Sequence, residues 1–224
     1  MRMFNEAYRQ ITGINEDSII PETERSIRQV LYIDGPLCSG KTTVLNLLSV
    51  EIPDAVIIPE FDREIPTAHI SISKASPLVD LLRSQFWFYG QHLAKDKLIR
   101  QYTGKIIADR GILGLFCYSN LFGTDQAVTQ KIIDRAMKYS WTPGLYVFLT
   151  ADPAVIKARF LQRNDGTLTE TEWDHGFGTY IHRLHQSVEA VAAAAGIPLL
   201  DTSNQSPQEV TTAIKQLYYE FFNF

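Results

Sequence analysis

The chain has 224 residues, of which 45% are apolar and 21% charged, and its formal net charge is −4. This length suits one α/β domain with a substantial core. Mild acidity without a dense Lys/Arg run argues against a nucleic-acid-binding surface, and no stretch of about 18 apolar residues is present to span a membrane. The first ten residues, MRMFNEAYRQ, lack the apolar core of a signal sequence, so we expect an intracellular, cytoplasmic protein.

Five short and mostly apolar segments predict buried strands, and helical patterns lie between them. The strand segments are residues 30–34, 54–58, 105–109, 145–149 and 197–201. The helical patterns begin at Thr43 and recur over 77–102, 112–122, 126–139, 152–163, 178–195 and from 206 onward. Because such alternation is typical of a parallel sheet covered on both faces, we expect a three-layer α/β sandwich with a five-stranded parallel sheet. We expect residues 1–28 to form a separate polar, helical extension and residues 29–224 to form the domain.

The segment between the first strand and the first helix reads GPLCSGKT and fits the pattern G-x-x-x-x-G-K-[ST] without a gap. Gly35 and Gly40 let the backbone curl so that consecutive N–H groups point at anionic oxygens, and the following helix adds its positive N-terminal end. Lys41 can then reach the β- and γ-phosphates, and the Thr42 hydroxyl can hold Mg²⁺. The motif predicts a nucleoside triphosphate site of the P-loop type. Its expected binding residues are Gly35, Pro36, Leu37, Cys38, Ser39, Gly40, Lys41, Thr42 and Thr43.

Further polar residues stand at the ends of the other predicted strands. Glu60 follows the second strand, Asp109 and Arg110 end the third, and residues 150–152 follow the fourth. In parallel sheets the ligand lies beyond the carboxyl ends of the strands, so these side chains converge in space. Asp109 offers a carboxylate to the Mg²⁺ shell, and Arg110 offers a cation beside the transferring phosphate or the acceptor. This convergence favours an enzyme over a passive binder.

The pattern differs from two common classes of P-loop protein. No Asn-Lys-x-Asp follows a strand, as switch GTPases require, and no apolar run ends in the Asp-Glu or Asp-Asp that is usual in AAA-type and transporter ATPases. Over about residues 29 to 220 the sequence instead resembles small-molecule kinases of the deoxynucleoside kinase and thymidylate kinase group. The stretches that carry this resemblance are the P-loop, Ile57–Glu60, Asp109–Gly111, Arg159-x-x-x-Arg163, Tyr180–Glu189 and Asp201–Ser203 with Glu209.

This resemblance implies roles for three further side chains. Glu60 matches the glutamate that removes the proton from an acceptor hydroxyl, so it is the candidate base. Arg159 and Arg163 match two arginines that open a lid over the ATP phosphates, here about residues 159–176. Because they are one helical turn apart, the two arginines face the same way and can clamp the γ-phosphate. Dimers are common among related kinases, so the resemblance also implies that a homodimer can form.

The acceptor side departs from both kinase families. The lid's third arginine falls near Asp165, and the acceptor-side aspartate of deoxynucleoside kinases falls near Leu115. The arginine-rich segment that thymidylate kinases use on the monophosphate is not evident. The long helix over 77–102 still offers acceptor candidates: Gln85 or Gln91 to read a base edge, and Phe86 or Tyr89 to stack on it. The same aromatic residues are also suited to a core.

Three functions follow in order of preference. The first is an ATP- and Mg²⁺-dependent kinase that phosphorylates a nucleoside or a nucleoside monophosphate. The second is a kinase of the same fold that acts on another small hydroxyl compound, such as a sugar, an antibiotic or a metabolite, and Leu115 favours this alternative. The third is a non-catalytic nucleotide sensor that keeps only the P-loop. For the first, the expected catalytic residues are Lys41, Glu60, Asp109, Arg110, Arg159 and Arg163.

Overall fold

The structure is a computed structural model that describes residues 28–61, 78–121, 126–163 and 178–222. Residues 1–27 of the predicted N-terminal extension lie outside the described residues, and Arg28 already belongs to the first strand. Most of the predicted lid, from 164 on, also lies outside them.

All five predicted strands are present and form one parallel sheet. They are β1 (Arg28–Asp34), β2 (Val56–Ile58), β3 (Gly104–Asp109), β4 (Leu145–Thr150) and β5 (Leu199–Asp201), and their spatial order is β2-β3-β1-β4-β5. The register of β1 places Ile33 opposite Asp109 of β3 and Asp34 opposite Phe148 of β4. The carboxyl ends of the three central strands therefore meet at one edge, where the P-loop begins.

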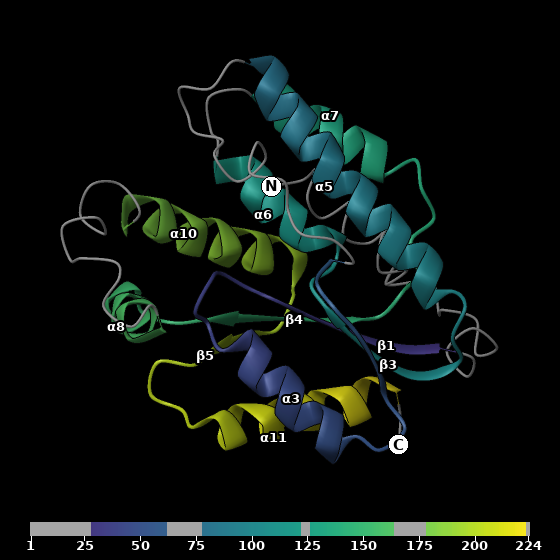
Figure 1. The fold of residues 1–224 in the computed structure, drawn as a ribbon, viewed down its shortest axis with the longest axis vertical. Coiled ribbons are helices and arrows are strands. Elements are labelled where there is room, and N and C mark those ends of the chain that lie inside the picture. The colour runs from purple at the N-terminus through teal and green to yellow at the C-terminus, as the bar shows by residue number, and fades with distance from the viewer. Residues whose placement is uncertain (1–27, 62–77, 122–125, 164–177, 223–224) are drawn as a thin grey trace.

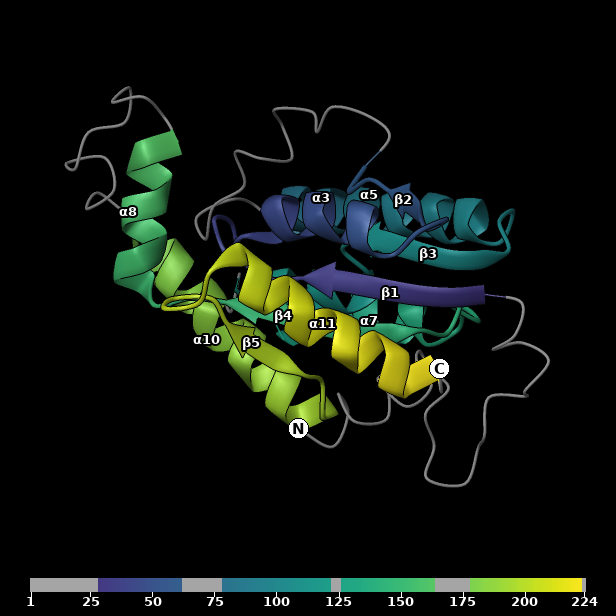
Figure 2. The same cartoon turned by 90° about the horizontal axis from the view of Figure 1, so that it is seen from below.

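Helices cover both faces of the sheet, as Figures 1 and 2 show. Two helices that contact each other, α3 and α11, lie on one face, and four helices lie on the other; α8 stands beyond the carboxyl ends of the strands. The helices are α3 (Lys41–Glu51), α5 (Leu78–Ile99), α6 (Ile112–Leu121), α7 (Gln126–Ala136), α8 (Pro153–Arg163), α10 (Gly178–Ala195) and α11 (Pro207–Phe222). The predicted three-layer α/β sandwich is confirmed.

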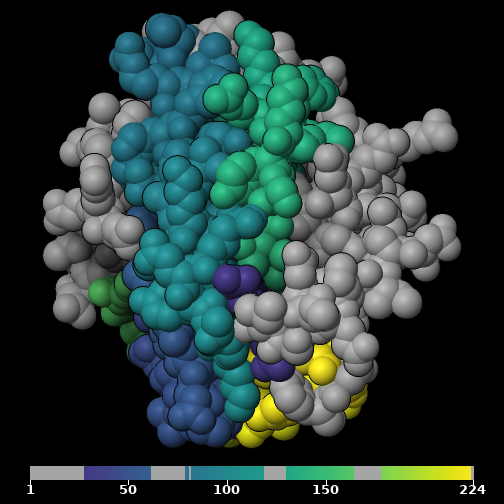
Figure 3. All heavy atoms as spheres, turned by 90° about the vertical axis from the view of Figure 1, so that its right-hand side faces the viewer, coloured from purple at the N-terminus to yellow at the C-terminus, as the bar shows by residue number. Residues whose placement is uncertain are grey.

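The strands supply both cores because successive side chains of a strand point to opposite faces. In β1, Leu31 and Ile33 pack with the α3 and α11 side of the sheet, whereas Val30 and Tyr32 pack with the α5, α6, α7 and α10 side. In Figure 3, α5 lies beside α7 over this second face. A strand with helices on both sides must be apolar at almost every position, and this explains the strand pattern of the sequence.

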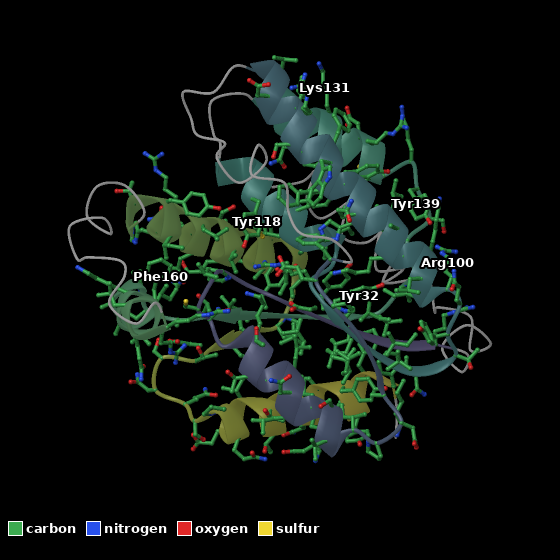
Figure 4. All side chains as sticks on the ribbon, in the orientation of Figure 1. Tyr32, Arg100, Tyr118, Lys131, Tyr139 and Phe160 are labelled. Atoms are coloured by element: carbon green, nitrogen blue, oxygen red, sulfur yellow. The ribbon has the colours of Figure 1, made fainter. Side chains whose placement is uncertain are left out.

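A buried carboxylate on α5 ties this helix to the segment before β4. Asp96 accepts hydrogen bonds from Arg100 Nε at 2.7 Å, Tyr139 Oη at 2.9 Å and the Thr142 amide at 2.7 Å. The Arg100 guanidinium lies 5.7 Å from the centre of the Tyr139 ring, and Figure 4 shows both side chains near the carboxyl end of α5. Three donors thus compensate the burial of one charge.

We expect Asp96→Ala to lower the free energy of unfolding by about 1–3 kcal/mol, because it leaves the buried Thr142 amide without its acceptor and removes the hydrogen bonds from Tyr139 and from the partly exposed Arg100. Asp80→Ala removes a carboxylate from the same helix whose pairing with Arg83 is solvent-exposed, so its effect should stay below about 1 kcal/mol. Urea unfolding measures both variants. Equal losses in the two would show that the Asp96 contacts are not a main link between α5 and β4.

The stability should also depend on pH through His92. The pKa of this histidine lies well below its ordinary value, because burial disfavours the charged ring and Lys95 and Arg110 repel a further positive charge. The unfolded chain therefore binds one proton more than the folded chain below about pH 6.5. We expect this residue alone to lower the stability by up to about 1.4 kcal/mol for each pH unit below that point.

Substitution of His92 by Gln removes the titrating group, so the variant should lose stability less steeply than the wild type on acidification from about pH 7 to pH 5. Thermal or urea unfolding at a series of pH values gives both slopes. Identical slopes for the two proteins would contradict a neutral His92 in the folded state.

Candidate functional site

The P-loop curls as its two glycines predict. Gly35 has φ = 140° and Gly40 has φ = 95°, values that L-residues with a side chain rarely adopt. A Cβ on Gly35 would lie 2.1 Å from the carbonyl oxygen of Leu149 in β4, so this position also requires a residue without a side chain. Gly40 leads directly into α3, which begins at Lys41. The loop and the amino end of a helix thus form one anion-binding turn.

Lys41 is folded over this loop. Its Nζ donates hydrogen bonds to the carbonyl oxygens of Gly35 at 3.0 Å and Pro36 at 2.8 Å. Burial and the neighbouring Arg110 lower the pKa of Lys41 to about 8, although three carboxylates around it act in the opposite direction. The ammonium is therefore preorganised beside the loop that phosphate groups would occupy.

One cavity of about 590 Å³ brings the predicted residues together. All six predicted catalytic residues line it. Six of the nine residues predicted to bind the nucleotide line it as well: Leu37, Cys38, Gly40, Lys41, Thr42 and Thr43. Gly35, Pro36 and Ser39 are not among the lining residues. The cavity is also lined by residues that were not predicted as site residues, namely Val44, Thr202, Gln205, Pro207 and Val210.

Arg110 is the centre of a buried cluster of charges. Its Nη1 donates to Asp34 Oδ1 and to the Gly35 carbonyl oxygen, both at 2.9 Å, and its Nε donates to Glu60 Oε1 at 2.5 Å. Its guanidinium lies 5.1 Å from the centre of the Tyr118 ring. Arg110 thus connects the end of β1, the P-loop, the end of β2 and the end of β3, and it orients Glu60 toward the cavity that both residues line.

Asp34 is the site residue that the sequence reading missed. Its carboxylate accepts from Arg110, from the Gly35 amide at 2.8 Å and from the Gly111 amide at 3.2 Å. A Cβ on Gly114 of α6 would lie 1.9 Å from its Oδ2, so this glycine makes room for the carboxylate. The only signal in the sequence was its place as a charge at the end of an apolar strand directly before the P-loop, and that place does not reveal its contacts.

Asp109 and Thr42 fit the expected Mg²⁺ site. Both line the cavity, and Asp109 Oδ1 is buried with no hydrogen-bond partner among the described residues. Burial raises the pKa of Asp109, with Lys41 acting against this shift. The described part of the chain holds no cluster of three or more His, Cys, Asp or Glu residues able to bind a metal. Mg²⁺ does not require one, because it is usually held by one or two carboxylates and by substrate phosphates.

The two arginines of α8 reach the cavity in different ways. Arg159 is held by three hydrogen bonds: to the Cys38 carbonyl at 3.3 Å, to Thr202 Oγ1 at 2.9 Å and to the Thr202 carbonyl at 2.6 Å. Thr202 Oγ1 in turn donates to the Ser39 carbonyl. Arg159 therefore links the P-loop to the loop after β5, whereas Arg163 is an exposed residue at the end of α8. Both arginines line the large cavity, and their action on a phosphate stays a prediction.

The acceptor candidates on α5 do not share one cavity, unlike the predicted catalytic residues. Gln91 lines a small hollow of about 10 Å³ together with Glu60 and Lys95. Gln85 and Tyr89 are buried and line neither this hollow nor the large cavity; Tyr89 Oη donates to the Arg135 carbonyl at 3.2 Å. Phe86 is 41% exposed. Gln91 is thus the candidate that the structure places beside Glu60.

No helix of the described residues is both long enough and apolar enough to cross a membrane.

Comparison with known proteins adds a fold but no close relative. No protein-family model matches the sequence, and no curated protein matches it significantly. Among solved structures, a thymidylate kinase from Candida albicans matches with a TM-score of 0.65 at 19% identity, over 87% of this chain and 92% of that protein. A thymidylate kinase from Ehrlichia chaffeensis matches with a TM-score of 0.56 at 13% identity, over 85% and 98%. Identities this low establish the fold alone, and the chain therefore has the P-loop α/β fold of thymidylate kinases.

Proposed function

We propose that this protein is an ATP- and Mg²⁺-dependent kinase that transfers the γ-phosphate to a nucleoside or a nucleoside monophosphate. The observation that supports this most is the convergence of Lys41, Glu60, Asp109, Arg110 and the α8 arginines on one cavity at the carboxyl edge of the sheet. Phosphoryl transfer needs positioning and neutralisation of charge more than covalent chemistry, and these side chains supply both. The thymidylate kinase fold supports a nucleotide as the substrate.

The P-loop and α3 hold the nucleotide in this proposal. The phosphate oxygens compete with the Gly35 and Pro36 carbonyls for the Lys41 ammonium, and the amino end of α3 favours their negative charge. Thr42 and Asp109 would hold Mg²⁺, which neutralises phosphate charge when it is bound. Arg163, at the end of α8, adds a further cation that lines the same cavity.

Glu60 and Arg110 act on the acceptor. A bond forms between the acceptor oxygen and the γ-phosphorus as the bond from this phosphorus to the ADP oxygen breaks, and the hydroxyl proton passes to the Glu60 carboxylate. Arg110 holds Glu60 in place through the 2.5 Å hydrogen bond. A phosphate acceptor is already deprotonated at neutral pH, so a monophosphate would not need Glu60 as a base.

A second candidate function is the transfer of phosphate to another small hydroxyl compound. Leu115 stands near the position of the acceptor-side aspartate of deoxynucleoside kinases, and it is 4% exposed within the core of α6. A hydrocarbon at this position cannot bind a base amide. This substitution favours an acceptor that is recognised by other groups. A nucleotide sensor without transfer activity is the remaining alternative.

We expect Lys41→Ala to weaken ATP binding by about 10–100-fold, because a hydrogen bond between charged groups contributes about 1.5–3 kcal/mol. Lys97→Ala is the matched control, since Lys97 is an exposed lysine in the last turn of α5. Isothermal titration with Mg²⁺ and a non-hydrolysable ATP analogue measures both affinities. Unchanged affinity in folded Lys41→Ala would contradict a nucleotide site at the P-loop.

Glu60→Gln separates transfer to a hydroxyl, transfer to a phosphate, and nucleotide sensing without transfer. With a hydroxyl acceptor, kcat should fall by about 100-fold or more, because general-base catalysis contributes about 10²–10⁴-fold, whereas ATP affinity stays the same. With a phosphate acceptor, the loss should be much smaller. Steady-state rates with each acceptor and titration with ATP provide the two readouts. A wild-type protein that binds ATP but transfers nothing, with Glu60→Gln indistinguishable from it, would instead indicate a sensor.

A further inference from the structure

A second buried lysine stands behind the site, on α5, and none of the roles above uses it. Lys95 is 6% exposed. Its Nζ donates to the main-chain carbonyl oxygens of Asp109 at 2.5 Å and Arg110 at 3.3 Å. The same nitrogen lies 5.5 Å from the centre of the Phe61 ring. Lys95 therefore contacts the last residue of β3, the residue after it, and the residue that follows Glu60.

Burial of the Lys95 ammonium lowers the stability of the fold unless its hydrogen-bond partners compensate, and these partners identify the segment that it fixes. An ammonium buried without partners is strongly destabilising, and a long apolar side chain would fill the same space without this cost. Both hydrogen-bond acceptors of Lys95 belong to the two residues proposed to bind Mg²⁺ and to orient the base. The contact is with their backbone, so Lys95 acts on the position of Asp109 and Arg110 and does not line the large cavity itself.

The segment that Lys95 holds has an unusual backbone. Arg110 has φ = 63°, in the left-handed region that residues other than glycine seldom adopt and that the surrounding structure must maintain. From β1, the Ile33 carbonyl accepts from the Arg110 amide at 2.9 Å, and Asp34 accepts from the Gly111 amide. From α5, Lys95 donates to the carbonyl oxygens of Asp109 and Arg110. Hydrogen bonds from β1 and from α5 thus fix the turn after β3.

The charges around the turn also point to Lys95. Three carboxylates act on the Lys95 ammonium, those of Asp109, Glu60 and Asp34, and Arg110 repels it. Lys41 faces the same three carboxylates. With Lys41, Lys95 and Arg110, the cluster has as many positive as negative side chains. Lys41 belongs to the P-loop and Arg110 follows β3, whereas Lys95 comes from α5.

We propose that Lys95 is a positioning residue that fixes the Asp109–Arg110 turn, and that phosphoryl transfer depends on it. The catalytic part of this proposal rests on the proposed function; the structural part does not. Its test therefore combines one measurement on the turn itself with one measurement on turnover. The variants are Lys95→Met, which keeps the length and removes the charge, and Lys95→Arg, which keeps the charge. Lys97→Met, on the exposed side of the same helix, is the control.

Amide hydrogen exchange tests the structural part. In Lys95→Met, we expect the amides of residues 109–111 to exchange about tenfold faster, because the turn loses its donor from α5, while α10 and α11 exchange as in the wild type. Unchanged exchange at 109–111, or the same increase throughout the domain, would overturn the proposal. If Lys95→Met does not fold, Lys95→Gln is measured in its place against the same expectations, because its uncharged side chain is one bond shorter and weakens the hydrogen bonds to the two carbonyl oxygens.

Turnover tests the catalytic part. In Lys95→Met, we expect kcat to fall by about 100-fold, the loss typical of a misplaced catalytic group, whereas KM for ATP stays close to the wild-type value. Lys95→Arg should recover a large part of the lost kcat. A fall in kcat below about threefold, or a loss that Lys95→Arg does not reduce, would overturn the proposal. If the wild type transfers phosphate to no acceptor, the proposed function fails, and exchange at 109–111 still decides whether Lys95 fixes the turn.

Discussion

The site depends on one guanidinium more than on any other group. Arg110 joins the carboxylates of Asp34 and Glu60 and the Gly35 carbonyl, so that the ends of β1, β2 and β3 and the start of the P-loop are held at fixed separations. These strands are neighbours in the sheet. A buried, multiply bonded arginine is expensive to desolvate and is retained only where its full set of partners is present. This arrangement places a candidate base beside a phosphate-binding loop.

The packing around this cluster explains several small residues. Gly35 approaches the Leu149 carbonyl too closely for a Cβ, and Gly114 makes room for the Asp34 carboxylate. The helices on the α5 face then supply side chains that support the cluster from behind, with Tyr118 beside Arg110 and Lys95 beneath the turn. Figure 4 shows Tyr118 on this side of the sheet. The P-loop is thus held by the sheet on one side and by the charge cluster on the other.

Local patterns in the sequence were sufficient to predict the fold and part of the candidate site. The five strands, the P-loop and the convergence of Glu60, Asp109 and Arg110 follow from short motifs and from the rule that parallel strands end at a common edge. Asp34 and Lys95 could not be assigned in this way. Asp34 looks like the last residue of a strand, and Lys95 looks like one of several charges on a long helix; only tertiary packing shows that both are buried against the same turn. The acceptor residues and the lid remain predictions for the same reason, since an acceptor pocket is formed by side chains from distant segments.

The central claim is that the cavity transfers a phosphoryl group, and direct transfer of label tests it best. The full chain is incubated with Mg²⁺ and ATP labelled in the γ-phosphate, together with nucleosides, nucleoside monophosphates and common sugars in turn, and Lys41→Ala serves as the inactive control. The account predicts that label moves to one nucleoside or monophosphate and that this transfer is lost in the control. If ATP binds and its label is transferred to none of the acceptors, the account of this protein as a nucleotide kinase is contradicted.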